Sequence, residues 1–272
     1  MTTTKAITEL KVGIFGVGIM GEALLAGLIS AGVTPAQISF VEKRDERAAE
    51  ISQKYGAHRS SLEAVASQSD LLLLVVKPQD LAELVAELDL HLNAAALLVS
   101  FAAGKSTHFI ESRLATPAAV IRVMPNTPVL IGAGASVLSA GANVTSSHVA
   151  LVTQLLSSSG LVLTIDESLQ DAVTATSGSG PAYFFAFVEA MVEGSVALGM
   201  PLEVATALTV QTIVGAAGML TQTGKSATTL RENVTSPNGT TAAALHAFND
   251  GELKALVAKA MRAARDRSQE LA

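Results

Sequence analysis

Three glycines near the start of the chain have the spacing of a phosphate-binding loop. Gly16, Gly18 and Gly21 follow an apolar stretch at residues 11–15 and lead into an amphipathic helical pattern at residues 22–31. In such a loop the first glycine allows a tight turn, the second lets the backbone approach a pyrophosphate, and the third lets helix and strand pack closely. The flanking strand and helix favour a dinucleotide site at the helix N-terminus over an ordinary glycine-rich turn.

The residues that would select the dinucleotide follow a second predicted strand at residues 38–41. An acidic side chain at this point bonds the ribose 2′-hydroxyl of NAD, whereas a basic one pairs with the 2′-phosphate of NADP. Glu42 therefore favours NAD, while Lys43 and Arg44 favour NADP, and a solvated charge run is the alternative for each of them. We expect NADP as the cofactor, with NAD as the second candidate.

Two further segments end predicted strands on the side where ligands bind in open α/β sheets. Val75, Val76 and Lys77 close the apolar run at residues 71–76, and Lys77 either reaches the cofactor or caps the sheet edge. Ala103 lies in an Ala-Ala-Gly segment after the next predicted strand, at residues 96–101. That segment is either backbone that approaches a ligand or a tight turn.

Two motifs in the second half of the chain place hydroxyl groups and glycines before predicted helices. Residues 177–183 (SGSGPAY) lead into a helical pattern at 181–198, and residues 235–241 (TSPNGTT) lead into another at 241–248. Hydroxyls and free amides at a helix start bind a carboxylate or the nicotinamide end of a cofactor without a cationic side chain. Helix capping beside a turn is the alternative interpretation of both motifs.

The residue types that are missing narrow the chemistry further. The sequence has no cysteine, and its five histidines lack metal-ligand spacing, so we expect no metal site. It has no Gly-x-Ser-x-Gly motif, which disfavours a serine hydrolase, and no lysine close behind residues 177–181 to serve a hydroxyacid dehydrogenase as general acid. A protonated imine needs little acid help to accept hydride, so an imine is the substrate that these residues favour.

Composition and charge restrict the partners. A net charge of −6, from 18 basic and 24 acidic residues, disfavours a nucleic-acid partner. Only 15% of residues are charged and 49% are hydrophobic, and residues 123–165 and 204–224 contain no Asp, Glu, Lys or Arg. Both stretches carry Ser, Thr, Asn, Gln or Pro, which indicates burial and no membrane partner. The first residues lack the pattern of a signal peptide, so we expect a cytoplasmic protein.

The order of the predicted elements indicates an α/β fold. Strands alternate with helices up to residue 165, and everything after it is helical. We predict a doubly wound, mostly parallel Rossmann-type sheet in residues 1–165, which binds the dinucleotide, and an all-α substrate and dimerisation domain in residues 166–272. The uncharged helix at 203–221 is our candidate for the interface with a second copy. Further predicted strands lie at 120–124 and 161–165, and further helices at 45–55, 81–88, 109–114, 169–176 and 253–271.

Five motifs, in order along nearly the whole chain, resemble the pyrroline-5-carboxylate reductases. They are the glycine loop with Met20, residues 76–79 (VKPQ), 124–128 (MPNTP), 171–184 (DAVTATSGSGPAYF) and 235–241 (TSPNGTT). The last two are highly specific. The resemblance implies reduction of 1-pyrroline-5-carboxylate to L-proline with NADPH or NADH, the final step of proline biosynthesis. It also implies homodimers through intertwined helical domains, which often assemble further into decamers.

The resemblance assigns roles to individual residues. In the cofactor site, one group of residues would wrap the pyrophosphate, another would line the rest of the dinucleotide, and Lys43 would face the adenosine ribose or its phosphate. Some family members have Asn about where Leu62 falls, close to the adenine, so the resemblance leaves that contact open. The first group is Phe15, Gly16, Val17, Gly18, Ile19 and Met20, and the second is Val75, Val76, Lys77 and Ala103, with Asn233 near the nicotinamide.

In the substrate site, Glu167, Thr240 and Thr241 match substrate-contacting positions, and Ser236 and Gly239 would help to hold the carboxylate. Thr241 is the predicted catalytic residue, because its hydroxyl would bond the ring nitrogen while hydride passes from nicotinamide C4 to the imine carbon. Catalysis would then consist mostly of positioning.

Two alternatives remain at this point. Another NAD(P)-dependent imine or 3-hydroxyacid oxidoreductase is disfavoured by the missing lysine and the intact TSPNGTT turn. A non-catalytic dinucleotide sensor is disfavoured because the helical half has no basic face.

Overall fold

The computed structural model describes residues 7–271 and divides the chain into two compact units. The first unit comprises Met1–Ser179 with Ala264–Ala272, and the second comprises Gly180–Ala263. The predicted division after residue 165 falls earlier in the chain than this boundary. The reason is local packing: the segment after the last strand belongs to the first unit, where the Gln170 side chain is fully buried and donates to Val137 O at 3.1 Å.

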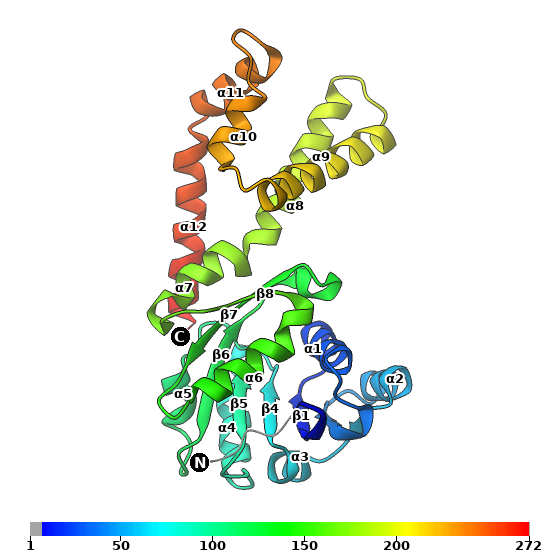
Figure 1. Ribbon diagram of the computed structural model, residues 1–272, viewed down its shortest axis with the longest axis vertical. Coiled ribbons are helices and arrows are strands. Elements are labelled where there is room, and N and C mark those ends of the chain that lie inside the picture. The colour runs from blue at the N-terminus through cyan, green and yellow to red at the C-terminus, as the bar shows by residue number, and fades with distance from the viewer. Residues whose placement is uncertain (1–6, 272) are drawn as a thin grey trace. The chain divides into compact units, whose positions relative to one another are not determined.

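An eight-stranded, mostly parallel sheet forms the centre of the first unit (Figure 1). Its strand order is β3-β2-β1-β4-β5-β6-β7-β8, and β6 and β7 pair antiparallel while β7 and β8 pair parallel, so β7 and β8 run opposite to the other six strands. The predicted α/β fold class is thereby confirmed, and each predicted strand agrees with an observed one to within two residues at either end. The strands are β1 (Val12–Phe15), β2 (Ile38–Val41), β3 (His58–Arg59), β4 (Leu71–Leu74), β5 (Leu97–Ser100), β6 (Ala119–Met124), β7 (Gly134–Ala140) and β8 (Gly160–Thr164).

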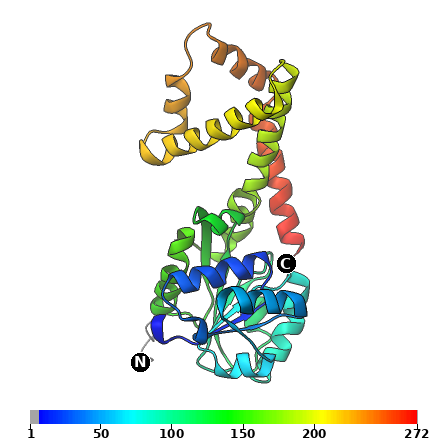
Figure 2. The same cartoon turned by 90° about the vertical axis from the view of Figure 1, so that its right-hand side faces the viewer.

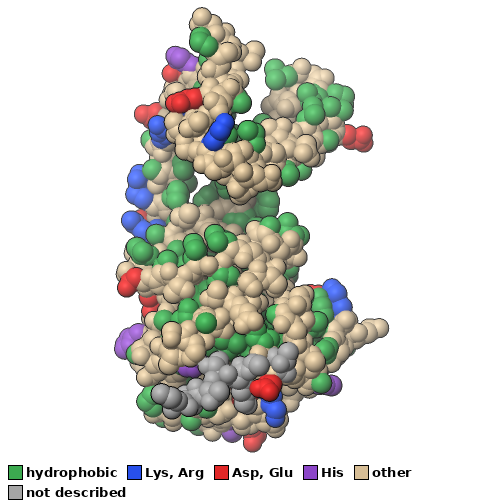
Figure 3. Space-filling model, viewed as in Figure 1, with side chains coloured by type: hydrophobic (Ala, Val, Ile, Leu, Met, Phe, Trp, Pro, Cys, Tyr) green, Lys and Arg blue, Asp and Glu red, His purple; other side chains and the backbone are tan. Residues whose placement is uncertain are grey.

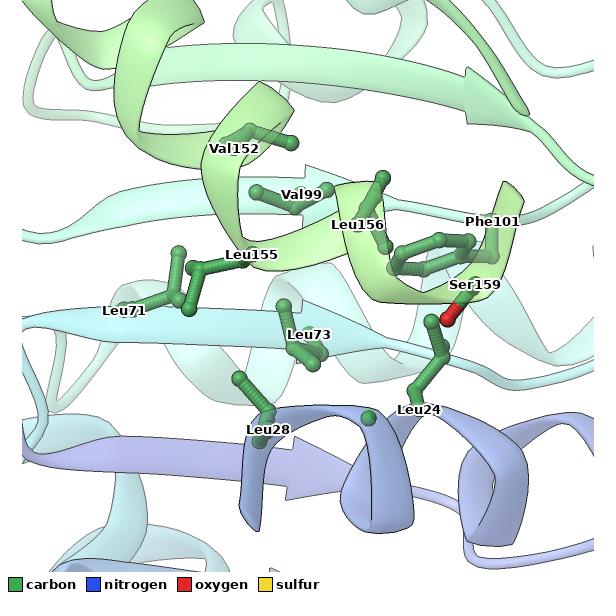
Figure 4. A pocket seen from close by; sticks show the side chains of 11 residues that line it. Leu24, Leu28, Leu71, Leu73, Val99, Phe101, Val152, Leu155, Leu156 and Ser159 are labelled. Atoms are coloured by element: carbon green, nitrogen blue, oxygen red, sulfur yellow. The ribbon is translucent and has the colours of Figure 1, made fainter. Parts of the chain in front are cut away.

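Helices cover both faces of the sheet, and the central strand β4 is therefore apolar throughout. The four leucines of β4 show this directly: Leu71 and Leu73 join the core beneath α1 and α6, while Leu72 and Leu74 join the core on the other face. Figure 4 shows the first of these cores around a small cavity lined mostly by apolar side chains of α1, β4, β5 and α6. The helices of this unit are α1 (Ile19–Ser30), α2 (Asp45–Tyr55), α3 (Leu62–Gln68), α4 (Leu81–Asp89), α5 (Thr107–Glu111), α6 (Ser146–Leu156) and α7 (Gln170–Val173).

The predicted helix at 109–114 was placed too late in the chain. The observed helix α5 begins at Thr107, because the Ser106 side chain caps it by accepting a hydrogen bond from Phe109 N at 3.0 Å. Ser106 is therefore the start signal, although the apolar periodicity begins only at Phe109.

Within the described residues, the second unit contains helices and no strand (Figures 1 and 2). This agrees with the prediction, and the helices predicted at 181–198, 203–221 and 253–271 agree with the observed ones to within one residue at either end. Its helices are α8 (Gly180–Ala197), α9 (Leu202–Gln222), α10 (Ala227–Asn233), α11 (Thr240–Asp250) and the greater part of α12 (Leu253–Glu270).

Helix α9 is long and apolar but poorly covered within the chain. It is the one helix of the described residues with the length and composition to cross a membrane, and only 11% of its most apolar window is buried. Its exposed apolar side chains include Leu208, Val214 and Met219, and Figure 3 shows hydrophobic side chains on the surface of this unit. A large exposed apolar surface of this kind marks an interaction site.

Candidate functional site

The glycine loop joins β1 to α1, and each glycine has a different steric reason to be there. Gly16 has a φ of +93°, and a Cβ on it would lie 2.7 Å from the backbone oxygen of Val75. A Cβ on Gly21 would overlap the backbone oxygen of Gly16, so this glycine allows α1 to pack against the loop. A Cβ on Gly18 would meet nothing within 4 Å. Gly18 therefore borders open space at the start of α1, where a pyrophosphate binds in loops of this type.

The start of α1 has the backbone donors that an anion needs. Gly18 is the N-cap residue and supplies no side-chain cap, and the first intrahelical bond runs from Glu22 N to Gly18 O at 2.9 Å. The amides of the first helical turn before Glu22 have no acceptor within the helix. This is the arrangement that binds phosphate groups.

The sheet register brings the other predicted cofactor residues to the same edge. Phe15 lies opposite the last residues of both β2 and β4, and Leu74 lies opposite Ser100 at the end of β5. The segments that follow these strands therefore neighbour the glycine loop at the carboxyl edge of the sheet, where the strand order reverses direction around β1. They contain Lys43 and Arg44 after β2, Val75, Val76 and Lys77 after β4, and Ala103 after β5.

Glu42 is already bonded within the protein at the position that selects the ribose. Its carboxylate, whose side chain is only 8% exposed, accepts hydrogen bonds from Val17 N at 3.3 Å and from Arg44 N and Nε at 3.0 Å each. Burial raises the pKa of Glu42, but the hydrogen bonds from Arg44 and Val17 outweigh it and hold the pKa below its ordinary value. Arg44 is 65% exposed and Lys43 is exposed as well. The two basic side chains are thus accessible where the acidic one is engaged.

Arg47 also contacts the glycine loop, although nothing in the sequence distinguishes it from the other charged residues of its helix. Its Nε donates to Val17 O at 2.8 Å, and its side chain forms ion pairs with Glu22 and Glu50. Only the packing of α2 beside the loop reveals this role.

Glu167 lies in the first unit and has three contacts there. Its carboxylate accepts hydrogen bonds from Thr107 N at 2.8 Å and Thr107 Oγ1 at 2.6 Å, and Arg122 Nη1 lies 3.6 Å away. The Arg122 side chain is only 5% exposed, so Glu167 is the carboxylate that balances a buried charge. Its predicted contact with substrate stays a prediction.

The SGSGPAY segment does not form the free helix start that its residues suggested. A π-helical turn at Thr174–Gly178 joins α7 to α8, and Ser179 N donates to Thr174 O at 2.8 Å. The Ser177 hydroxyl donates to Val173 O at 3.2 Å, and Asn126 of the MPNTP motif donates to Ser177 O at 3.1 Å. The Ser177 hydroxyl and the Ser179 amide thus bond within the protein, and binding of a ligand by this segment stays a prediction.

The TSPNGTT segment does form a turn followed by a free helix start. Gly239 N donates to Ser236 O at 3.0 Å, and Asn238 has a φ of +58°, which together with Pro237 is typical of a type II turn. Helix α11 begins at Thr240 with Gly239 as an N-cap that supplies no side-chain bond. Among the described residues, the hydroxyls of Thr240 and Thr241 have no hydrogen-bond partner. They remain available to a ligand, together with the amides of the first helical turn.

The predicted site residues are thus divided between the two units. The first unit contains the glycine loop, the residues after β2, β4 and β5, and Glu167. The second contains Asn233 at the end of α10 and, around the start of α11, Ser236, Gly239, Thr240 and Thr241.

A Rossmann-type sheet with an open glycine loop at its switch point, followed by an all-helical region, defines the class of two-domain dinucleotide-dependent oxidoreductases. Two family profiles match the chain. "NADP oxidoreductase coenzyme F420-dependent" matches residues 11–104, and "Pyrroline-5-carboxylate reductase dimerisation" matches residues 167–271. The first covers every predicted cofactor residue except Asn233, and the second covers the predicted substrate residues.

Curated and solved relatives agree with these profiles. Pyrroline-5-carboxylate reductase of Arabidopsis thaliana is 40% identical (96% of this chain, 95% of the relative), and that of Pseudomonas aeruginosa is 42% identical (96% and 97%). The structure of the enzyme from Coxiella burnetii has a TM-score of 0.89 at 34% identity and covers 97% of this chain and 98% of its own. The Plasmodium falciparum enzyme, solved with NADP bound, has a TM-score of 0.88 at 28% identity (98% and 99%). The chain belongs to the pyrroline-5-carboxylate reductase family.

Proposed function

We propose that this protein reduces 1-pyrroline-5-carboxylate to L-proline with NADPH, the last step of proline biosynthesis. The observation that carries the proposal is that two backbone segments are open to ligands. These segments are the glycine loop around Gly18 and the start of α11, where the threonine hydroxyls have no partner. Family membership over 96% of the chain connects these two segments to one reaction.

In the cofactor site, Phe15 to Met20 wrap the pyrophosphate, and the amides at the start of α1 donate to it. Val75, Val76, Lys77 and Ala103 line the dinucleotide, and Asn233 lies near the nicotinamide. When bound, the reduced cofactor would supply the hydride that the imine carbon accepts. The protein's own part is to fix the distance and orientation of the two reactants.

In the substrate site, the Thr241 hydroxyl forms a hydrogen bond with the ring nitrogen of the imine, and Thr240 contacts the same ring. Ser236 and Gly239 hold the substrate carboxylate through the hydroxyl and the backbone at the turn. Glu167 completes the set as a substrate contact. The first four are supported by the free hydroxyls and amides of the α11 start, which suit the anionic carboxylate of the substrate.

NADP rather than NAD is supported by the groups at the end of β2. The Glu42 carboxylate is bonded to Val17 and Arg44 and is thus unavailable to a ribose 2′-hydroxyl, while Lys43 and Arg44 are exposed to meet a 2′-phosphate. NAD remains the second cofactor. Relative kcat/KM with the two reduced cofactors tests this, and a clear preference for NADH would contradict it.

The test of the reaction is NADPH oxidation in the presence of 1-pyrroline-5-carboxylate, with proline-dependent NAD⁺ reduction at high pH as the reverse assay. Thr241→Ala should lower kcat about 10²-fold, as expected for the loss of one oriented hydrogen-bonding group, and Thr241→Ser should restore most of it. Thr235→Ala is the matched control, because that hydroxyl already donates to Arg231 O at 2.6 Å within the same motif. Near-normal turnover by Thr241→Ala with unchanged cofactor binding would remove Thr241 from the mechanism.

The chain contains the dimerisation region of its family, and we propose that the functional domains divide after residue 165, with homodimers forming through the helical part and decamers forming from dimers. The poorly covered apolar surface of α9 supports burial against a second copy. Sedimentation velocity distinguishes monomer, dimer and decamer. We place the enzyme in the cytoplasm, which cell fractionation tests.

A further inference from the structure

Arg47 holds the carbonyl side of the phosphate loop. It lies on α2 with its side chain 15% exposed, and its guanidinium donates from Nε to Val17 O at 2.8 Å and makes a longer contact from Nη2 to Gly18 O at 3.5 Å. These are two consecutive carbonyl oxygens of the loop between β1 and α1. The Gly18 amide and the amides that follow it are the groups expected to face a pyrophosphate.

Val17, whose carbonyl oxygen binds Arg47, is also held at its N–H, which donates to the Glu42 carboxylate at 3.3 Å. Val17 is therefore fixed at its N–H by a carboxylate and at its C=O by a guanidinium. Both of these side chains come from one short segment, the end of β2 and the start of α2. The backbone orientation at Val17 thus depends on the segment that also contains the ribose-selecting residues.

Arg47 is itself fixed by two carboxylates. It pairs with Glu22 on α1, and its Nη1 lies 2.7 Å from Glu50. Glu22 also accepts from Lys54 Nζ at 2.8 Å and from Tyr55 OH at 2.9 Å. These donors, Lys54 first and then Arg47, lower the pKa of Glu22 to about 2, so it is ionised at neutral pH. A guanidinium held in this way presents its remaining N–H groups to the loop with little loss of rotamer freedom.

The electrostatic consequence concerns a bound anion. Backbone carbonyl oxygens repel a phosphate, and a loop that rotated them toward the site would exchange attraction for repulsion. We propose that Arg47 is a positioning residue for the cofactor: it keeps the Val17 and Gly18 carbonyls directed away from the pyrophosphate, so that the loop amides are preorganised to bind it. This rests on the proposed function only in taking a pyrophosphate-containing dinucleotide as the ligand.

Arg47→Gln and Arg47→Lys test the proposal through the dissociation constants of NADPH and NADH, measured by titration calorimetry without substrate. We expect Arg47→Gln to weaken both cofactors by a similar factor, about 10- to 100-fold, because both contain the pyrophosphate, as for one or two charge-assisted hydrogen bonds. Arg47→Lys keeps the charge but not the planar guanidinium, so its dissociation constants should lie between those of the wild type and those of Arg47→Gln. At saturating NADPH, kcat should stay within about threefold.

The matched control is Lys54→Gln. Lys54 lies on the same helix and donates to the same Glu22 carboxylate, but within the described residues it contacts Glu22 and the Tyr55 ring and not the loop carbonyls. It should leave both dissociation constants within about twofold.

Four results would overturn the proposal. One is wild-type affinity in Arg47→Gln, and another is an equal loss in Lys54→Gln, which would assign the effect to the Glu22 cluster. A third is a loss confined to NADPH, which would make Arg47 a ligand of the 2′-phosphate. The fourth is a loss of kcat at saturating cofactor with unchanged affinity. If Arg47→Gln does not fold, Arg47→Lys against Lys54→Gln gives the same comparison. Because cofactor binding is measured without the imine, failure of the proposed reaction would leave this test intact.

Discussion

The glycine loop makes a prediction that separates binding from stability at two positions only two residues apart. A Cβ at Gly18 meets nothing within 4 Å and the residue has a φ of −65°, which any L-residue adopts, so Gly18→Ala should fold normally. Its methyl group would project into the space in front of the first helical turn. Losing one or two charge-assisted hydrogen bonds from that turn costs about 1.5 to 3 kcal/mol, or 10- to 150-fold in the dissociation constant of NADPH.

Gly16→Ala should behave in the opposite way. Its φ of +93° is strained for alanine, at about 1–3 kcal/mol, and the added Cβ would lie 2.7 Å from Val75 O. We expect a total of about 2–4 kcal/mol of destabilisation, which for a chain of this size lowers Tm by about 5–15 °C.

The assays are thermal unfolding followed by circular dichroism, since the chain has no tryptophan, and calorimetric titration with NADPH. Gly18→Ala should have the Tm of the wild type and a weaker affinity for NADPH, whereas Gly16→Ala should have a lower Tm than the wild type. If Gly18→Ala bound NADPH like the wild type, the pyrophosphate would not lie against this glycine. If Gly18→Ala lost as much stability as Gly16→Ala, the open space beside Gly18 would have been misinterpreted.

Three further predictions concern charge and association. The pKa of Glu22 is lowered from 4.5 to about 2, so the stability that its ion pairs contribute is fully present above pH 4.5 and is lost as the pH falls toward 2. Glu22→Gln should therefore reduce the fall in the free energy of unfolding over that pH range by about 1–2 kcal/mol, measured as urea midpoints at several pH values. A fall in stability equal to that of the wild type would contradict this. Glu167→Gln should lower the free energy of unfolding by about 1–3 kcal/mol, because it leaves the buried Arg122 without its carboxylate. Thr107→Val removes one donor to the same carboxylate and should lower it less. A Tm of Glu167→Gln equal to that of the wild type would refute the role of Glu167 as the partner of Arg122. Val214→Asp, at a 58% exposed position on α9, should shift sedimentation toward monomer while helicity is kept, and a persistent dimer would place the interface elsewhere.

The buried strands could be predicted from the sequence because a strand that is covered on both faces is a continuous run of apolar residues. The four leucines of β4 have no alternative placement in a soluble sheet, and β1 and β5 are equally apolar. Strand β7 was not predicted as a strand: Gly134–Ala140 contains two serines and three small residues, and it follows a glycine-rich stretch. Its polar residues Ser136 and Ser139 are buried, and Ser139 donates to Ile165 O at 3.0 Å. Only tertiary contacts explain why such a segment pairs.

The sequence predicted which residues form the glycine loop better than it predicted which polar groups of the site are free to bind a ligand. The spacing of Gly16, Gly18 and Gly21 is enough to predict the loop, because the positive φ of Gly16 and the close approach of Gly21 to Gly16 O arise within the loop itself. Whether Glu42 is free for a ribose depends on Val17 and Arg44, and no spacing rule reports that the carboxylate is already bonded. The π turn between α7 and α8 was missed for the same reason, since glycine and serine there are equally consistent with a loop.

The division of polar groups in this chain follows from its low charge. The carboxylates of Glu22, Glu42 and Glu167 each bind two or more donors within the first unit, and so hold the α1 start, the ribose segment and the α5 start in place. At the two helix starts that are open to ligands, the described groups with no protein partner are neutral: the amides of the first turn beside Gly18, and the hydroxyls of Thr240 and Thr241. Hydride transfer to an imine develops little new charge on the protein, so neutral donors suffice at these two helix starts, while the three carboxylates fix the geometry around them. It follows that substituting a scaffold carboxylate should change affinity or stability, and substituting a free hydroxyl should change kcat.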